Sequence, residues 1–245
     1  VYKRQHELTH KLAKMSGIAY LPPNIAKHEF NQIGYPHCQF VDNEGAQCYI
    51  VWNSKELVLV FRGTEANKWN DIKADINAWF TPQKVGWCHM GFDKELRKLW
   101  YQIEWHVEAQ AENKKLYITG HSLGGAMATI CASKIEFYQV DFLCTFGSPR
   151  VGNRKFVKNI PVEHHRYVNN NDIVTSVPPA LMTYKHHGKM KYINHYGKIR
   201  YMTVWQRLKD QLRGRWAAFK KRVPFDGAYD HSIKYYIRYT GEKND

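Results

Sequence analysis

The chain has 245 residues, 44% of them hydrophobic and 14% aromatic, which fits one large globular α/β domain over residues 1–245. No apolar run is long enough to cross a membrane, and no low-complexity tract indicates disorder. Thirty-six basic against 22 acidic residues give a formal net charge of +14, which favours an anionic partner such as lipid head groups, nucleic acid or an acidic polymer.

The cysteines and the N-terminal residues give only weak information on the cellular compartment of the protein. None of the five cysteines shows metal-binding or redox spacing. Cys38 and Cys48 could bridge a hairpin, and the sequence leaves this pairing open. No signal peptide is visible, because the first twenty residues lack a continuous apolar core. These features favour a cytoplasmic location and leave secretion open.

The N-terminal quarter of the chain predicts a helix followed by strands. Apolar residues at helical spacing predict an amphipathic helix over residues 5–20, ended by Pro22 and Pro23. Strands are expected near residues 38–41 and 48–52, on either side of a turn. The apolar run at residues 57–61 predicts a buried central strand.

Residues 65–80 predict a helix with an apolar face. Trp69, Ile72, Ile76 and Trp79 recur at steps of three, four and three residues. Such a helix could be a lid that covers a site in water and opens on lipid, with Trp69, Ile72 and Ile76 touching the substrate. An amphipathic helix that packs permanently on the body fits the spacing equally well.

The chain is organised around residues 115–130, which predict a strand, a sharp turn and the start of a helix. The turn, residues 120–124, has the pattern G-x-S-x-G with Ser122 at its centre. Glycine on both sides leaves room for a strained turn that lifts Ser122 Oγ out of the sheet. At the helix N-terminus, free N–H groups such as that of Leu123 favour an oxyanion. A glycine-rich turn without chemistry is the alternative.

The second half of the chain predicts further alternating elements. A helix is expected at residues 93–112, and strands at residues 141–146 and 165–168. Residues 182–222 predict an inserted basic hairpin and helix, with the hairpin at 182–203. The helix at 204–222 carries an apolar face made by Trp205, Leu208, Leu212, Trp216 and Phe219. This face could lie on an anionic membrane; we favour its burial against the protein.

A nucleophilic serine needs a base and a carboxylate that orients the base. In α/β hydrolases the acid and then the histidine follow the serine along the chain. Asp172 follows Ser122 at the end of a predicted strand, and His231 precedes the last predicted helix. Asp210 and Asp226 lie in or after the basic helix and fit less well. His89 could line the pocket, but a core role is favoured.

Together these blocks resemble the class 3 lipases of the fungal type, within the α/β-hydrolase fold. The matching blocks are Phe61-Arg62-Gly63-Thr64, His89 to Phe92, Gly120 to Gly125, Phe146 to Asn153, Val168 to Val174, and Asp230-His231. The resemblance implies a mostly parallel central sheet with helices on both faces and a lid helix. It implies hydrolysis of lipid esters through an acyl-enzyme, without metal or cofactor. It also implies Thr64 as an oxyanion residue, whose hydroxyl Asp71 or Asp75 could hold.

The sequence departs from the family pattern in two places. Ser148 stands where the family often has glutamine, and Thr175 where proline is common; neither is expected to touch the triad. The basic segment between Asp172 and His231 is much larger than in the compact fungal enzymes, which leaves the substrate range and the role of residues 198–222 open.

Several functions fit this reading. A triacylglycerol lipase or esterase is favoured, with a phospholipase A at anionic membrane surfaces as the alternative. A non-catalytic lipase-like binding module is a third candidate. A nucleic-acid partner is not expected, because no recognition motif is present. Acyl length, head group and oligomeric state stay open.

Overall fold

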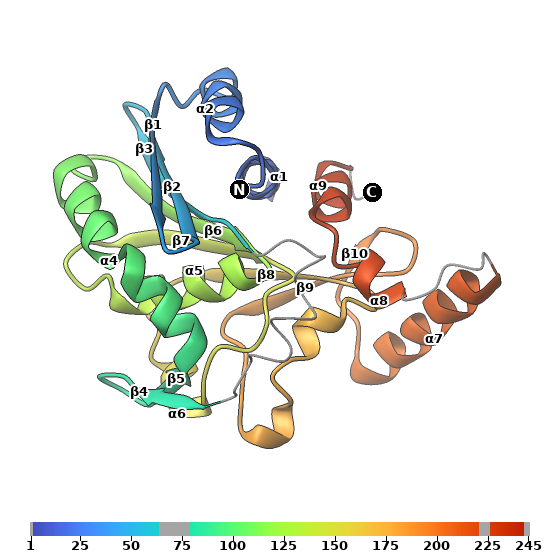
Figure 1. Cartoon of the computed structure of the whole chain (residues 1–245). Helices are drawn as coiled ribbons and strands as arrows, with labels where there is room; N and C mark the ends of the chain where they lie inside the picture. The colour runs from blue at the N-terminus through green and yellow to red at the C-terminus, as the bar shows by residue number, and fades with distance from the viewer. Residues whose placement is uncertain (1, 64–78, 221–225, 243–245) are drawn as a thin grey trace.

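A computed structural model describes residues 2–63, 79–220 and 226–242. Within these ranges an eight-stranded sheet forms the centre of the molecule (Figure 1). Its strands, in spatial order, are β1 (His37–Asn43), β2 (Ala46–Trp52), β3 (Glu56–Phe61), β6 (Lys115–His121), β7 (Val140–Phe146), β8 (His164–Asn169), β9 (Lys189–Ile193) and β10 (Ile199–Arg200).

Parallel pairing dominates the middle of this sheet. β3, β6, β7, β8 and β9 pair in parallel, while β1, β2 and β3 pair antiparallel at one edge and β9 and β10 at the other. Parallel strands need crossover connections, and these place helices on both faces of the sheet. The prediction of a mostly parallel sheet covered on both faces is confirmed.

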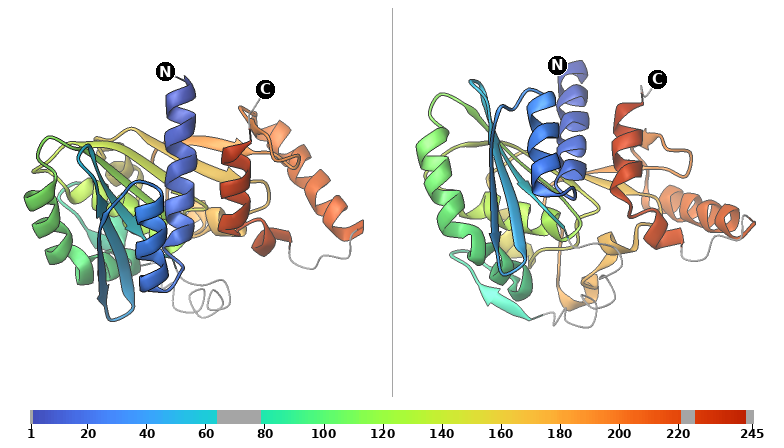
Figure 2. Two further views of the ribbon diagram at one scale, coloured as in Figure 1. Left: turned by 90° about the horizontal axis from the view of Figure 1, so that it is seen from above. Right: turned by 45° about the horizontal axis from the view of Figure 1, so that its top comes forward.

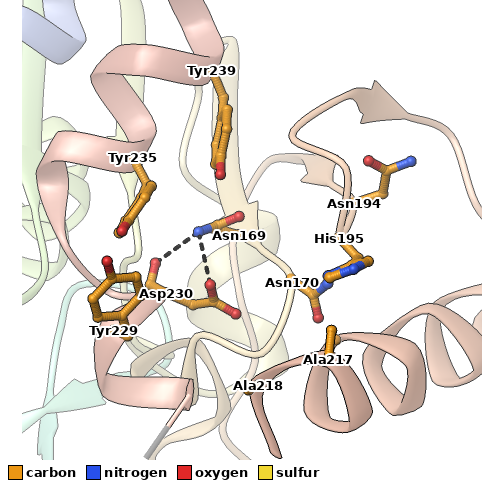
Figure 3. Close-up of a pocket in the computed structure, with 11 residues that line it drawn as sticks. Asn169, Asn170, Asn194, His195, Ala217, Ala218, Tyr229, Asp230, Tyr235 and Tyr239 are labelled. Atoms are coloured by element: carbon orange, nitrogen blue, oxygen red, sulfur yellow. Dashed lines mark hydrogen bonds between the residues drawn. The ribbon is translucent and has the colours of Figure 1, made fainter. Parts of the chain in front are cut away.

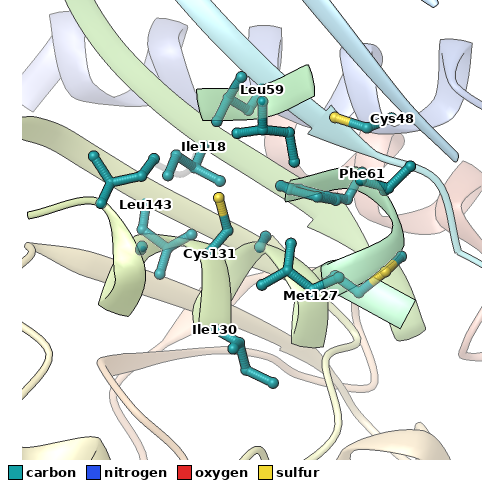
Figure 4. Close-up of a cluster of buried hydrophobic side chains, with 14 of the residues drawn as sticks. Cys48, Leu59, Phe61, Ile118, Met127, Ile130, Cys131 and Leu143 are labelled. Atoms are coloured by element: carbon teal, nitrogen blue, oxygen red, sulfur yellow. The ribbon is translucent and has the colours of Figure 1, made fainter. Parts of the chain in front are cut away.

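One face of the sheet packs against α4 (Met90–Gln110), α5 (Leu123–Lys134) and α6 (Arg154–Lys158). Leu59, Phe61 and Ile118 of the sheet meet Met127 and Cys131 of α5 (Figure 4). Small residues at the start of α5 let this helix lie close to the strands, so its side chains are buried nearly all round. α5 therefore holds the residue before it, Ser122, in a fixed position.

The other face packs against α1 (Tyr2–Ile18), α2 (Pro23–Gln32) and α9 (Ile233–Gly241). α1 and α9 lie side by side (Figure 2). Gly17 of α1 packs against Ile237 of α9. The predicted first helix is confirmed. α2 was not predicted: Pro23 stands at its first position, where the fixed φ of proline and its missing N–H suit a helix start.

Smaller elements complete the described chain. β4 (Phe80–Pro82) and β5 (Trp87–His89) form a two-stranded sheet before α4. Two 3₁₀ turns, η2 (Ile173–Ser176) and η3 (Ala180–Met182), follow β8. The predicted hairpin is confirmed only for β9 and β10. The part of its first arm that precedes β9 is wrong, because Thr183 ends η3 in a left-handed conformation and His186 Nε2 bonds to the Thr175 carbonyl.

The basic helix α7 (Val204–Lys220) and the short α8 (Asp226–Tyr229) lie at the β10 edge of the sheet, outside the three layers (Figures 1 and 2). The helix is confirmed, but the expected burial of its apolar face is wrong. Trp205 and Phe219 are each 75% exposed, and the buried residues of α7 are Asp210 and Gly214.

The structure tests the expected cysteine pairing but not the predicted lid. All five cysteines lie within them as free thiols, so Cys38 and Cys48 do not pair. Residues 65–78 of the predicted lid, including Trp69, Ile72 and Ile76, lie outside the described ranges. Among the helices that are described, none combines the length and apolarity that crossing a bilayer requires.

Candidate active site

Ser122 stands at the turn between β6 and α5, with φ of 59° and ψ of −130°. A left-handed conformation costs a serine about 1–3 kcal/mol and persists only where the surroundings enforce it. Here the backbone is too close for side chains on either side. A Cβ at Gly120 would stand 2.4 Å from the Gly124 carbonyl, and one at Gly124 would stand 2.3 Å from Phe61 O. The predicted sharp turn is confirmed, and it presents Ser122 Oγ beyond the strand end.

The structure brings the three predicted triad side chains together. His231 Nε2 lies 2.8 Å from Ser122 Oγ, and His231 Nδ1 lies 3.0 Å from each oxygen of Asp172. A carboxylate only accepts, so Nδ1 carries the hydrogen and Nε2 accepts from the serine hydroxyl. Ser122 is fully buried, and Asp172 and His231 nearly so. This is the arrangement in which histidine can remove the serine proton.

Asp172 is held by donors other than His231. Its Oδ1 accepts from the Val174 amide at 2.9 Å, and its Oδ2 accepts from the Tyr236 hydroxyl at 2.5 Å. The Thr175 hydroxyl donates to the Asp172 carbonyl at 2.9 Å. The expectation that Thr175 does not touch the triad is therefore wrong. Tyr236 was not predicted, because it comes from α9, 64 residues further along the chain.

The loop that carries Asp172 is bonded to the residue that precedes His231. The Asn169 side chain donates to the Asp230 carbonyl at 2.9 Å (Figure 3). The Asn171 amide donates to Asp230 Oδ2 at 3.0 Å. These bonds fix the end of β8 against the loop before α9, so acid and base keep their separation independently of their own contact.

His121 supports the base from behind. Its Nε2 donates to the His231 carbonyl at 2.7 Å, and its Nδ1 accepts from the Tyr20 hydroxyl at 2.8 Å. The His121 and His231 rings stack with their centroids 4.5 Å apart. Burial, and next the neighbouring His231, lower the pKa of His121 well below its usual range. His121 is thus neutral beside the catalytic candidate and adds no second positive charge when His231 takes up a proton.

Leu123 is the first residue of α5, next to Ser122. N–H groups of a first helical turn have no acceptor within the helix, so the Leu123 amide can donate to an oxygen bound near Ser122. Thr64, Asp71 and Asp75 lie outside the described residues. The loop before Thr64 does reach the turn, since a Cβ at Gly63 would stand 3.1 Å from Ser122 Cβ.

His89 is a core residue, as the sequence favours. It is buried at the N-terminus of α4, where its Nδ1 accepts from the Phe92 amide and its ring stacks on Phe92 at 4.0 Å. Burial lowers the pKa of His89 to about 4. A histidine that stays neutral in such an apolar setting serves the fold.

The chain is similar in sequence to curated lipases over its middle part. The lipase of Rhizomucor miehei is 31% identical over 156 residues, which cover 58% of this chain and 42% of that protein. Lipase ZK262.3 of Caenorhabditis elegans is 30% identical over 157 residues, which cover 58% and 43%. The chain thus spans less than half the length of these relatives.

Structural and family comparisons agree with the geometry. Lipase II from Rhizopus niveus matches with a TM-score of 0.64 at 24% identity, over 78% of this chain and 81% of that one. This likeness shows the fold, and the predicted α/β-hydrolase fold is confirmed. The family model for Lipase (class 3) matches residues 58–182, which is 125 of 245 residues. The chain therefore belongs to the class 3 lipase family.

Proposed function

We propose that this chain is a serine hydrolase that cleaves carboxylic esters of lipids. The observation that carries the proposal is the hydrogen-bonded series Ser122, His231 and Asp172 at a strained strand-to-helix turn. Ser122 is the nucleophile, His231 the general base and acid, and Asp172 the group that orients His231. The class 3 lipase relationship supports lipid esters as substrates.

Acylation begins when Ser122 Oγ attacks the ester carbonyl carbon while its proton passes to His231 Nε2. The carbonyl oxygen becomes negative and accepts the Leu123 N–H. Thr64 N–H is proposed as the second donor on the strength of the family resemblance. Asp172 stabilises the imidazolium through Nδ1. The bond to the alcohol oxygen then breaks, and that oxygen takes the proton from His231, which leaves an acyl group on Ser122.

Deacylation repeats these steps with water. His231 Nε2 takes a proton from a water molecule as the water oxygen attacks the acyl carbon. The bond to Ser122 Oγ breaks, Oγ regains the proton from His231, and the fatty acid leaves. Neutral His121 and the Tyr236 hydroxyl keep both partners of the His231–Asp172 pair in place throughout.

The burial of Ser122 supports a site that must open before substrate can bind. Because the residue is fully buried, an ester reaches its Oγ only after the groups that cover it move. We propose Trp69, Ile72 and Ile76 as the substrate-facing side of a lid. Comparing hydrolysis of one ester below and above its solubility limit tests this. A jump in rate at the limit is expected, and a smooth curve would contradict a lid.

The nucleophile is tested with a soluble p-nitrophenyl ester of a short acid. Ser122→Ala is expected to abolish hydrolysis and labelling by a fluorophosphonate. Ser133→Ala, in the same helix, is the matched control and should retain both. A wild-type protein that neither hydrolyses the ester nor labels would overturn the hydrolase proposal and favour the non-catalytic binding module.

A phospholipase A is the second candidate, supported by the net charge of +14 and by the exposed basic residues of α7. The two candidates differ in head group. We would compare release of fatty acid from triacylglycerol emulsions with release from vesicles of anionic phospholipid. Faster release from the vesicles would favour the phospholipase, and the reverse would favour the triacylglycerol lipase.

A further inference from the structure

Helix α7 presents a continuous apolar stripe to solvent. The stripe consists of side chains spaced three or four residues apart, so they share one face of the helix. All of them are exposed: Trp205, Leu208, Leu212, Trp216 and Phe219. Trp216 and Phe219 lie with nearly parallel rings, with centroids 6.1 Å apart. Burying aromatic side chains is strongly favourable, so a stripe of this kind on a rigid helix calls for an apolar environment.

The opposite face of α7 is polar and is fixed to the protein. Asp210 accepts from the Tyr192 hydroxyl at 3.0 Å, the His195 amide at 2.9 Å and the Asn170 side chain at 3.3 Å. Gln211 donates to the Asn170 carbonyl at 3.1 Å. Rotating the stripe inward would take the Asp210 carboxylate away from the Tyr192, His195 and Asn170 donors and leave these buried groups without their acceptor, which is costly. The outward orientation is therefore a property of the fold.

Beneath α7 lies a partly open pocket with a mixed lining of polar, aromatic and small side chains. A cavity of about 340 Å³ separates α7 from α9 (Figure 3). It is lined from α7 by Gly214, Ala217 and Ala218 and from the body by polar and aromatic side chains, including Asn194 and Tyr239. These residues form no apolar groove into which the stripe could pack. The pocket therefore gives the stripe no alternative position against the protein.

Basic side chains border the stripe on both sides. Lys209, Arg213 and Lys220 follow one border and Arg215 the other, and all four are exposed. The single acidic residue in the sequence of α7 is Asp210, which is buried. Lys220 Nζ lies 5.4 Å from the Trp216 ring centroid. The exposed surface of α7 is thus apolar in the middle and purely basic at the rims.

We propose that α7 is a docking helix that lies in the plane of an anionic lipid surface. Its aromatic stripe enters the boundary between head groups and acyl chains, and its rims contact the negative head groups. Charge complementarity favours this occupant, since the rims carry four positive charges and no negative one. The choice of a lipid surface rests on the proposed function, but binding is measured without turnover.

The position of α7 relates this surface to the active site. A Cβ at Gly214 would stand 2.9 Å from the Asn171 side chain, and the Asn171 side chain donates to the Gln211 carbonyl at 3.2 Å. Asn171 immediately precedes Asp172. A membrane bound by α7 would therefore be anchored to the same loop that holds the triad acid, which keeps the site next to its lipid.

The test uses the full chain with Ser122→Ala, so that lipid stays intact, and co-sedimentation with vesicles of phosphatidylcholine with and without phosphatidylserine. We expect binding to the anionic vesicles that weakens with salt. Adding Trp205→Ser and Trp216→Ser should weaken it at least about tenfold. Lys209→Gln with Arg213→Gln should weaken it about 25-fold, or about fivefold per charge. Trp105→Ser, an exposed tryptophan on α4, is the matched control and should bind normally.

Three results would overturn the proposal. They are equal binding by the stripe variant and the Trp105→Ser control, equal binding to neutral and anionic vesicles, and a wild-type dimer that the stripe variant converts to monomers without any vesicle binding. Circular dichroism melting checks that each variant folds. Vesicle binding by a protein that hydrolyses no ester would retain the docking helix and reject the hydrolase, so the two proposals fail separately.

Discussion

Two buried carboxylates are connected to the loop that follows β8: Asp172 is part of this loop, and Asp210 of α7 accepts from its Asn170 side chain. Asp172 and Asp210 are each 2% exposed, and each accepts from a tyrosine hydroxyl and a backbone amide. For Asp172 these donors are Tyr236 and Val174, and for Asp210 they are Tyr192 and the His195 amide. The third partner differs: it is the His231 ring for Asp172 and the Asn170 side chain for Asp210.

This difference suits Asp210 to a structural role and Asp172 to the catalytic role that we propose for it. Both are desolvated and both are supplied with donors, as burial requires. Only the imidazole can change its charge during a reaction, so only Asp172 can stabilise a positive charge that appears and disappears. Asp210 uses the same kind of hydrogen bonds to hold α7 in one orientation.

The largest expected effect separates the two carboxylates in activity. Asp172→Asn should lower kcat on a soluble ester by about 10⁴-fold, because an amide in that place favours the wrong tautomer of His231. Asp210→Asn should leave kcat near the wild-type value. Both are measured as initial rates beside thermal melting. A comparable loss of kcat in Asp210→Asn at an unchanged melting temperature would remove the distinction.

His89 differs from both carboxylates because burial alone, without a charged partner, shifts its pKa. Its pKa of about 4 lies below the unfolded value of about 6.5, so between these values the unfolded chain binds a proton that the folded chain does not. Stability should therefore fall on acidification through this range, by at most about 3 kcal/mol for this group. Urea unfolding at several pH values measures the slope.

His89→Asn provides the control for this slope, because asparagine keeps an acceptor at the start of α4 and cannot titrate. The acid-side loss of stability should become shallower in this variant. An unchanged slope would show that His89 does not contribute, and that the other buried histidines carry the effect.

Replacing the tyrosine that donates to each carboxylate by phenylalanine should give two smaller effects that can be compared directly. Tyr236→Phe should lower kcat about tenfold at a similar KM, because a hydrogen bond to a charged group is worth about 1.5–3 kcal/mol. Tyr192→Phe should leave kcat unchanged and lower the free energy of unfolding by about 1.5–3 kcal/mol, because its acceptor is a carboxylate too. Equal losses of kcat in the two variants would contradict the division between catalytic and structural carboxylates.

The smallest effect is expected on the exposed stripe. Leu212→Ala should change the free energy of unfolding by less than about 0.5 kcal/mol, since its side chain packs on nothing that orients α7. Leu99→Ala, at a fully buried position of α4, should cost about 2–5 kcal/mol. If denaturant unfolding gave similar losses for both, the polar anchoring of α7 by Asp210 would be wrong.

Helices α4 and α7 show how far periodicity carries a prediction. Both have apolar residues at steps of three and four, and both form where the sequence predicts them. Leu99 of α4 is buried on the sheet, whereas Leu212 of α7 faces solvent. Periodicity identifies a face but not what covers it. The deciding contacts of α7 come from Asn170, Tyr192 and His195 on other segments, which no local pattern reveals.

The same limit applies at the active site. Ser122, Asp172 and His231 could be predicted because a turn motif, a strand end and the chain order each restrict the choice. Tyr236, Tyr20 and the neighbouring His121 could not, because their roles depend on α1 and α9 packing side by side on one face of the sheet. The lid and Thr64 remain predictions, since both lie outside the described residues.

The bond from Tyr20 to His121 has a consequence for how the chain can be shortened. The class 3 lipase match begins at residue 58, so a fragment trimmed to that boundary would look complete by family criteria. It would retain Ser122 and could retain His231, yet it would lack the hydroxyl that fixes the ring on which His231 rests. In engineering terms, the smallest fragment that keeps this site intact is set by its hydrogen bonds and extends beyond residues 58–182, the segment that the family model matches.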